Sequence, residues 1–364
     1  MSCRCGLVGL PNVGKSTIFN ALTGGQAEVA GYPFTTIAPQ TGMVPVPDHR
    51  LETLGRLLQP AKLTPTTIEF VDIAGLIEGA SQGEGLGNQF LANIRDVDLL
   101  VHVVRVFEAP DIPHRGPGLD PVGDVGLIDT ELLLADLEIL RRQVLKIEKA
   151  AKSGEKKIAA QLEFLRRLED FINQGQWARE FPVVRGEAAW WAELPLLTKK
   201  PYLLVANASE PEWQTRRYLP VLEELAAQRR VPLVVILGDL EAELQDLPPA
   251  DRQEFLAAAG LPESGLRRLI RASYELLDLI TFYTIVGPEV RAWTVPAGTP
   301  AARCAGRIHS DMEKGFIKAE IMSYDDLVRL GSAARVKEAG LLHLEGRDYP
   351  IQDGEVVLFR FQSH

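Results

Sequence analysis

The sequence of 364 residues predicts an α/β protein in which helices cover a parallel sheet. Short apolar runs rich in β-branched residues recur along the chain, helical stretches separate them, and the first run leads into a glycine-containing loop. Strands that are apolar on both faces are typical of a parallel sheet packed between helices. The predicted strands are Cys3–Gly9, Ile68–Ile73, Leu99–Val106, Tyr202–Ala206 and Leu233–Leu237.

The composition is that of a folded globular chain, with 46% hydrophobic and 24% charged residues. Its length suggests two to three domains. No apolar run approaches the ~18–20 residues that span a bilayer, and the N-terminus lacks a secretory pattern. The three cysteines, Cys3, Cys5 and Cys304, argue against a disulfide framework or a zinc site. We therefore expect a cytoplasmic protein with no membrane partner.

A phosphate-binding loop follows the first predicted strand. Residues 9–16 read G-L-P-N-V-G-K-S, the G-x-x-x-x-G-K-[ST] pattern, between that strand and a predicted helix Lys15–Thr23. The two glycines let consecutive backbone N–H groups face one anion, and the helix adds its positive end. Lys15 would reach the β- and γ-phosphates, and Ser16 would offer an oxygen to Mg²⁺. The nucleotide-binding residues predicted from this loop are Asn12, Val13, Gly14, Lys15, Ser16 and Thr17.

Two further motifs indicate a GTPase-like nucleotide switch. Residues 72–75 read D-I-A-G at the end of a predicted strand. Asp72 would hold a Mg²⁺-bound water there, and the Gly75 N–H would sense the γ-phosphate. Residues 31–36, G-Y-P-F-T-T, lie between the two motifs and offer a threonine to the metal. The order of the three motifs carries this prediction, because D-x-x-G alone is common in turns.

Two departures from the GTPase pattern bear on activity. Leu76 stands where many GTPases carry a water-orienting glutamine, so hydrolysis is expected to be slow or to use another group. Residues 207–210 read N-A-S-E in place of the guanine-reading N-K-x-D. Glu210 moves the carboxylate outward by one methylene, and Ala208 removes the lysine stem that packs on the base. A site that fails to pair the guanine edge loses selectivity, so ATP is expected to bind better than GTP.

A helical hairpin is predicted between sheet strands. Glu131–Lys152 and Glu155–Asn173 carry apolar residues at helical spacing, and Ser153-Gly154 separates them. Arg141 to Arg167 holds nine Lys or Arg against three Glu, a local charge of +6 in a chain of net charge −10. This stretch is either an ordinary solvated helix face or a patch that binds nucleic acid.

The C-terminal part reads as a small mixed β/α domain that begins near Thr281. Its predicted elements are strands Val290–Val295, Phe316–Ile321 and Val356–Phe361 and a helix Tyr324–Leu330. The predicted domains are a nucleotide-binding domain at 1–128 and 196–280, an inserted hairpin at 129–195, and a C-terminal domain at 281–364.

These motifs resemble those of Obg-related GTPases, and more closely those of the Obg-like ATPase (YchF) family. The resemblance covers essentially the whole chain, including G-L-P-N-V-G-K-S-T, Y-P-F-T-T, D-I-A-G-L-I-E-G-A and the N-A-S-E segment. Residues 291–294, 308–311 and 345–349 resemble that family's TGS domain, a ubiquitin-like β-grasp module. The resemblance implies a P-loop NTPase with a GTPase-like G domain, an inserted helical coiled-coil hairpin and a TGS domain. It further implies a cytosolic ATPase that associates with ribosomes.

The resemblance also bears on single residues. It selects Thr36 over Thr35 as the metal ligand, and it favours a base contact for Phe107, which would otherwise be an ordinary strand-end aromatic. In related GTPases an asparagine at the place of Asn12 helps to bind K⁺; the alternative is that it only caps the turn. His114 is a candidate to assist hydrolysis from a Pro- and Gly-rich loop, or is a loop histidine without a role.

The residues predicted to form the base pocket are Phe107, Asn207, Ala208 and Glu210. The family often has a Ser-Ala-Lys-like element before L-E-A-E-L, whereas residues 237–239 read L-G-D here, which weakens the case for tight base selectivity.

The sequence leaves three functional interpretations. The leading one is a slow, Mg²⁺-dependent ATPase switch that acts as a monomer. It would bind rRNA on the ribosome through the basic hairpin and the TGS-like domain, and the particle bound would be the large subunit or a 70S-type ribosome. A non-hydrolysing, ATP-gated ribosome-binding module is the first alternative. An Obg-type GTPase is the second, and Glu210 argues against it.

Overall fold

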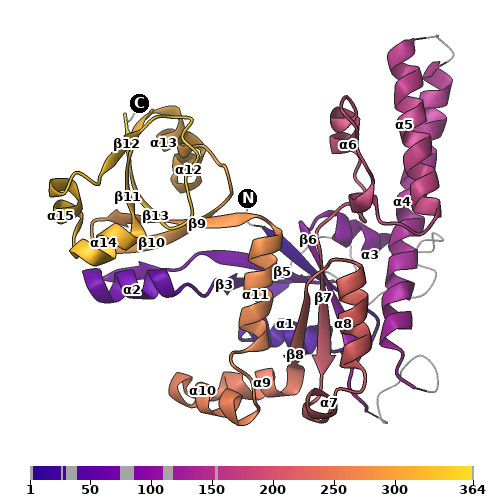
Figure 1. Cartoon of the computed structure of the whole chain (residues 1–364), viewed down its shortest axis with the longest axis horizontal. Coiled ribbons are helices and arrows are strands. Elements are labelled where there is room, and N and C mark those ends of the chain that lie inside the picture. The colour runs from indigo at the N-terminus through magenta and orange to yellow at the C-terminus, as the bar shows by residue number, and fades with distance from the viewer. Residues whose placement is uncertain are drawn as a thin grey trace. The chain divides into compact units, whose positions relative to one another are not determined.

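The computed structural model describes residues 3–25, 28–29, 39–73, 86–109, 118–151 and 155–362 (Figure 1). Apart from the first two residues, the chain forms two compact units. The first comprises Cys3–Gly42 and Glu69–Leu269, and the second comprises Met43–Ile68 and Ile270–His364. This grouping puts residues 43–68 with the C-terminal unit, whereas the sequence pattern assigns them to the nucleotide-binding domain. The predicted domain boundaries stay a prediction.

The first unit is built on a seven-stranded sheet with the strand order β2-β3-β5-β1-β6-β7-β8. The strands β5, β1, β6, β7 and β8 run parallel, as predicted, whereas the short edge strand β2 is antiparallel to β3. Their bounds are Arg4–Val8 (β1), Glu28–Val29 (β2), Gln40–Pro45 (β3), Thr67–Asp72 (β5), Leu99–Val106 (β6), Tyr202–Ala208 (β7) and Leu233–Leu237 (β8).

The central strands are fully buried, which explains their unbroken apolar sequences. Every residue of β6 and β7 is buried. Helices α1 and α9 pack together beside the sheet, and α4 and α8 do the same. Because neighbouring parallel strands end at the same edge of a sheet, the carboxyl ends of β1, β5, β6, β7 and β8 lie together at one edge. The helices of this unit outside the hairpin are α1 (Lys15–Thr23), α3 (Leu86–Arg95), α7 (Glu210–Thr215), α8 (Leu219–Gln228), α9 (Gly238–Asp246) and α10 (Pro249–Ala258). The helix α11 (Gly265–Leu276) begins in this unit and continues into the second one.

The inserted hairpin consists of α4 (Pro121–Ala151) and α5 (Lys156–Asn173), which run side by side (Figure 1). Leu140, Phe164 and Leu168 lie in the shared core of the two helices. The helix α4 begins at Pro121 and not at Glu131 as predicted. Proline is favoured at a first helical position, and the Asp120 side chain accepts a hydrogen bond from the Gly123 N–H at 3.0 Å.

The return from the hairpin to β7 is fixed by a buried carboxylate. This return contains the short helices η2 (Ala178–Glu180) and α6 (Ala188–Glu193). Asp136 of α4 accepts hydrogen bonds from the backbone N–H groups of Leu197 (2.7 Å) and Thr198 (2.8 Å) and from the Thr198 hydroxyl (2.6 Å). The hairpin is thereby anchored at its base to the first sheet.

The second unit is a six-stranded mixed sheet with the order β12-β11-β13-β9-β10-β4. Strands β9 and β13 are parallel neighbours in its middle, with antiparallel partners outside them, which is the β-grasp arrangement expected of the C-terminal domain. The strand bounds are Lys62–Thr64 (β4), Leu279–Val286 (β9), Glu289–Pro296 (β10), Phe316–Ser323 (β11), His343–Glu345 (β12) and Glu355–Phe361 (β13).

Helices cover both faces of this second sheet. Alternate residues of β9 face opposite ways, so Phe282 lies in one core and Tyr283 in the other. The Phe282 core holds residues of α12 (Ala301–Ile308) and α13 (Ser310–Lys314), and the Tyr283 core holds residues of α2 (His49–Leu58), α14 (Tyr324–Leu330) and α15 (Ala333–Glu338).

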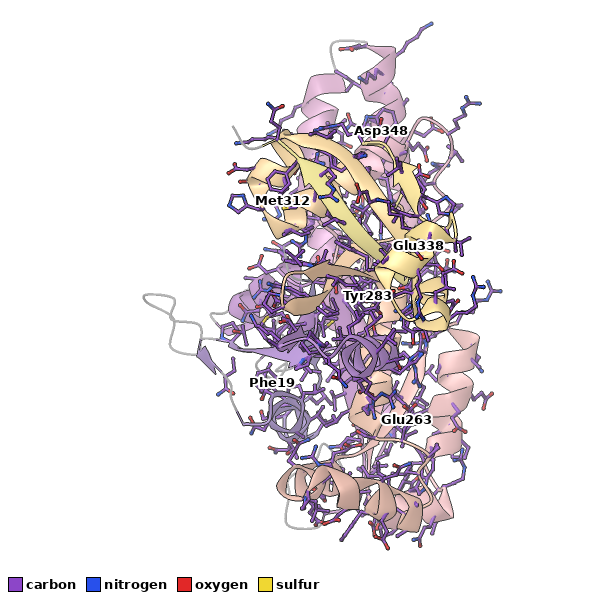
Figure 2. The ribbon with its side chains drawn as sticks, turned by 90° about the vertical axis from the view of Figure 1, so that its left-hand side faces the viewer. Phe19, Glu263, Tyr283, Met312, Glu338 and Asp348 are labelled. Atoms are coloured by element: carbon purple, nitrogen blue, oxygen red, sulfur yellow. The ribbon has the colours of Figure 1, made fainter. Side chains whose placement is uncertain are left out.

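Helix α2 is joined to this unit by polar contacts as well. The hydroxyl of Tyr283, labelled in Figure 2, donates to the carboxylate of Asp48, the residue that caps α2. Arg50 of the same helix forms two hydrogen bonds to Asp353, at 2.6 and 3.2 Å. Charged pairs of this bidentate kind are strong and geometrically specific, so α2 is an integral part of the C-terminal unit.

Within the described part of the chain, no helix combines the length and the apolar character needed to cross a bilayer.

Candidate nucleotide-binding site

The loop between β1 and α1 has a backbone that side chains would obstruct. Gly14 has φ +89°, and a Cβ there would collide with the Asn207 side-chain amide. At Gly9, with φ +155°, a Cβ would lie 2.5 Å from the Val103 carbonyl oxygen. Asn12 also adopts a left-handed conformation, with φ 61°, a region that asparagine tolerates. The loop is therefore closely fitted between β6 and β7, and it precedes the N-terminus of a helix, where anions bind.

Lys15 is the first residue of α1 and lies folded against this loop. Its Nζ donates to the Leu10 carbonyl oxygen at 3.1 Å, and the residue is only 7% exposed. Burial lowers the pKa of Lys15, and the nearby Asp72 carboxylate opposes that shift. A buried ammonium group held at the mouth of an N–H-lined loop is suited to an anionic ligand.

Ser16 and Asp72 meet beside the loop. The Ser16 hydroxyl donates to Asp72 Oδ2 at 2.7 Å. Burial raises the pKa of Asp72, whereas the Ser16 hydrogen bond and the charge of Lys15 lower it. The second oxygen, Asp72 Oδ1, is buried and has no hydrogen-bond partner among the described residues. A buried carboxylate oxygen without a partner is costly, and a serine–aspartate oxygen pair is the ligand type that Mg²⁺ prefers. The residues present therefore fit a magnesium ion.

Asn207, at the end of β7, ties the phosphate loop to its neighbours. Its amide Nδ2 donates to the Val13 carbonyl oxygen at 2.9 Å, and its Oδ1 accepts from the Gly238 N–H at 3.2 Å. Ala208 follows it and is buried, whereas Glu210 is exposed at the first position of α7. Both polar ends of the Asn207 side chain are thus engaged by the protein.

Phe107 follows β6 at the same edge of the sheet and is half-buried. The guanidinium carbon of Arg105 lies 4.6 Å from the centroid of its ring. Arg105 was not among the residues predicted for the site, although a charged residue within a predominantly apolar strand was a visible signal.

The remaining predicted residues divide into two groups. Thr17 is exposed on α1 beside Ser16. Thr36, Gly75, His114 and the hairpin residue Lys152 lie outside the described residues, so their proposed roles stay predictions.

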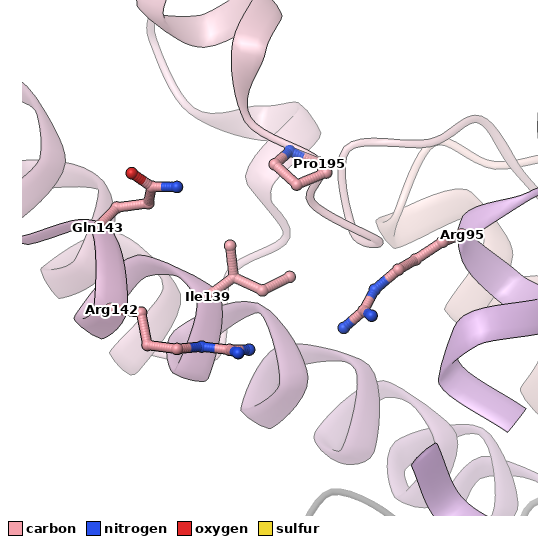
Figure 3. Close-up of a pocket in the computed structure, with 5 residues that line it drawn as sticks. All are labelled: Arg95, Ile139, Arg142, Gln143 and Pro195. Carbon is pink, nitrogen blue, oxygen red and sulfur yellow. The ribbon is translucent and has the colours of Figure 1, made fainter. Parts of the chain in front are cut away.

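Two hollows in the first unit lie away from the phosphate loop. One, of about 320 Å³, is lined by Arg95, Ile139, Arg142, Gln143 and Pro195 (Figure 3). The other, of about 310 Å³, shares Arg95 and Pro195 with it and extends to Pro201, just before β7 begins. They adjoin the amino end of β7, opposite the edge that carries Asn207, and neither includes a predicted nucleotide-binding residue.

Comparisons with known proteins show which family the chain resembles. A family model for the C-terminal region of YchF GTPases, described as "Protein of unknown function (DUF933)", matches residues 279–362. A second model, described as "50S ribosome-binding GTPase", matches residues 4–149.

Similar proteins cover the chain from end to end. This chain is 46% identical over 361 residues to a protein of Haemophilus ducreyi named "Ribosome-binding ATPase YchF", and the alignment covers 99% of each chain. A Bacillus subtilis protein of the same name is 45% identical and is covered completely. The solved structure of the Schizosaccharomyces pombe YchF GTPase superposes with a TM-score of 0.87 at 31% identity, over 99% of this chain and 98% of that one. A GTP-binding protein of Pyrococcus horikoshii, at 20% identity and a TM-score of 0.62 over both whole chains, shares the fold.

Proposed function

The chain belongs to the YchF family, and on that basis we propose that it is a ribosome-associated switch that binds ATP and slowly hydrolyses it to ADP and phosphate. Within this family it is a P-loop nucleotide hydrolase. The observation that supports the proposal most is the grouping of Lys15, Ser16 and Asp72 around a loop whose glycines admit no side chain.

Each of these residues has a distinct task in the proposed reaction. The N–H groups of the loop and the Lys15 ammonium bind the β- and γ-phosphates and offset the negative charge that develops in the transition state. Ser16 and Asp72 would hold Mg²⁺, with Thr36 as a further ligand. When bound, the metal neutralises phosphate charge. Asp72 Oδ1, buried and without a described partner, supports this assignment. We further propose K⁺ beside Asn12.

We propose that ATP binds more tightly than GTP. Ala208 has no lysine stem that could pack on a guanine base. Glu210 is exposed, so its carboxylate is not held in position to pair with the guanine edge. The Asn207 amide already has partners at both ends, so an adenine would be recognised by backbone groups and by Phe107 more than by this side chain.

Slow turnover is proposed because Leu76 cannot orient water, and His114 is proposed to assist instead. An unperturbed imidazole titrates near ~6.5, so it can polarise water at neutral pH. Unchanged basal and ribosome-stimulated turnover in His114→Ala would remove His114 from the mechanism. Comparing turnover in KCl and NaCl tests the role of K⁺ in the same assay.

Ribosome binding is proposed to use the lysines near the hairpin turn together with the TGS-like domain. The hairpin arginines already have carboxylate partners: Arg141 pairs with Glu169, Arg142 with Glu138, Arg166 with Glu148 and Arg167 with Glu187. Four exposed lysines, by contrast, form no ion pair with another described residue, and they are Lys146, Lys149, Lys156 and Lys157. Charges without partners are the ones that rRNA phosphates can neutralise. A cytoplasmic location and a monomeric state belong to the same proposal.

Competition calorimetry with ATP and GTP at equal Mg²⁺ tests the nucleotide assignment. A GTP affinity tenfold above that for ATP, about 1.4 kcal/mol, would favour the Obg-type GTPase instead. Single-turnover measurements with γ-labelled ATP test hydrolysis. If no labelled phosphate is released, with or without ribosomes, the chain is instead the non-hydrolysing, ATP-gated binding module.

A further inference from the structure

Arg105 is a charged residue in the middle of the first unit. It belongs to β6, every residue of which is buried, and it is itself only 2% exposed. Its register partner in the parallel strand β7 is Asn207. A buried guanidinium requires strong compensation, so its partners show what the residue holds in place.

The guanidinium of Arg105 is engaged with the segment that leaves β6. Its Nε donates to the Phe107 carbonyl oxygen and its Nη2 to the Ala109 carbonyl oxygen, both at 3.1 Å. The guanidinium carbon lies 4.6 Å from the centroid of the Phe107 ring. The Arg105 side chain thus holds the backbone of residues 107–109 by hydrogen bonds and also lies over the Phe107 ring. Such fork-shaped donation combined with stacking is specific to arginine, and lysine does not reproduce it.

A carboxylate of the hairpin compensates the charge of Arg105. Burial lowers the pKa of Arg105, and the Asp124 carboxylate opposes the shift. Asp124 is 4% exposed and lies in the first turns of α4. Arg105 therefore stays charged and fixed between the end of β6 and the start of the hairpin.

We propose that Arg105 is the positioning residue that holds the Phe107 ring in the orientation that receives the base of the nucleotide. The inference rests on the proposed function in one respect, namely that Phe107 contacts the base. In this proposal Arg105 acts on the nucleotide through Phe107, and we expect Lys15 and the Ser16–Asp72 pair to bind phosphate and metal without it.

The first test uses two ligands that differ in the base. Arg105→Met keeps the length of the side chain and removes the fork and the charge. We expect its affinity for ATP to fall about tenfold, or ~1.4 kcal/mol, because stacking on the base is lost. Its affinity for Mg²⁺-inorganic tripolyphosphate is expected to stay unchanged, because that ligand has no base. An equal loss for both ligands would mean general damage to the site and would overturn the proposal.

A matched control separates positioning from stability. Arg179 is likewise an arginine whose guanidinium carbon lies 4.6 Å from an aromatic centroid, that of Trp177, and burial likewise lowers its pKa. It lies in η2, on the return from the hairpin. Arg179→Met is expected to lower the unfolding free energy without changing the ATP affinity. Arg105→Lys, which keeps the charge facing Asp124, is expected to fold well and to recover only part of the ATP affinity.

A double-mutant cycle decides whether Arg105 acts through Phe107. In a Phe107→Ala background, Arg105→Met should cause no further loss of ATP affinity; losses that multiply would overturn the proposal. If Phe107→Ala leaves ATP affinity unchanged, the base contact in the proposed function is wrong, and this inference falls with it. If Phe107→Ala weakens ATP binding and neither Arg105 variant does, only the present inference is wrong.

Discussion

The side-chain amide of Asn207 donates a hydrogen bond to the carbonyl oxygen of Val13 at 2.9 Å, although the two residues lie far apart in the sequence. The same side chain accepts a hydrogen bond from the Gly238 N–H. One amide at the end of β7 therefore connects the phosphate loop with the start of α9, and we expect the shape of that loop to depend on it.

We expect Asn207→Asp to weaken ATP and GTP binding by a similar factor, on the order of tenfold to a hundredfold. The aspartate cannot donate to the Val13 carbonyl and places a charge against it, a loss of ~1.5–3 kcal/mol for a buried polar pair. Calorimetry with both nucleotides measures the two affinities. Ser209→Ala, which removes only the cap of α7, is the control. A loss confined to ATP would show that the amide reads the adenine base.

Lys15→Ala is expected to abolish hydrolysis, with a fall in turnover of at least about a hundredfold. The variant removes the buried ammonium that would compensate charge on the transferring phosphoryl group. Phosphate release under saturating Mg²⁺-ATP measures the effect. Wild-type turnover in this variant would mean that the phosphate-loop assignment is wrong.

Asp72→Asn is expected to remove most of the Mg²⁺ dependence of nucleotide binding. It replaces a carboxylate whose pKa burial raises, so the unfolding free energy should not fall, while the metal loses an anionic ligand. Titration of Mg²⁺ at fixed ATP, together with urea denaturation, follows both effects. An unaltered Mg²⁺ midpoint would place the metal elsewhere.

The sequence patterns of the phosphate loop are local, so the elements around that loop could be predicted directly, whereas the nucleotide and metal contacts stay predictions. The helix Lys15–Thr23 has the predicted bounds, and the predicted parallel strands are confirmed. The predicted start of α4 at Glu131 was wrong, because glycines at 123 and 126 interrupt the helical sequence pattern that begins at Pro121. The sequence did not single out Arg105, because its partners Phe107, Ala109 and Asp124 are identified only by the fold.

The charge of Asp136 makes stability depend on pH. Burial raises its pKa to about 6, despite the hydrogen bonds from Thr198 and Leu197. Because the folded pKa lies above the unfolded value near ~3.9, this contribution is full below pH ~4 and is lost as pH rises through 6. The maximum loss is about 3 kcal/mol, since each pKa unit equals ~1.4 kcal/mol.

Asp136→Asn removes this titration while keeping the size of the side chain. Its unfolding free energy should lie below that of the wild type, and we expect the difference to be largest near pH 4 and to shrink toward pH 7.5. Urea denaturation of both proteins across that range gives the two curves. Parallel curves would contradict a raised pKa for Asp136.

Lys156→Glu/Lys157→Glu is expected to weaken ribosome binding several-fold at low salt and to leave basal ATPase activity unchanged. Each lysine that no longer neutralises an rRNA phosphate lowers the slope of the salt dependence by about 0.7–0.9. Co-sedimentation with ribosomes between 50 and 200 mM salt, with and without ATP, measures this. Arg252→Glu/Arg267→Glu makes the same charge change on α10 and α11. Equal pelleting of the two variants would remove the hairpin from partner recognition.

The grouping of residues 43–68 with the C-terminal unit means that this domain cannot be obtained by a single cut. A fragment that begins at Leu279 lacks the edge strand β4 and the helix α2, and with them Leu51 and Leu54 of the Tyr283 core. Such a fragment would expose apolar surface and an open strand edge, both of which promote aggregation. The second unit is discontinuous in sequence, so we expect residues 279–364 to fold stably only when the segment 43–68 is present.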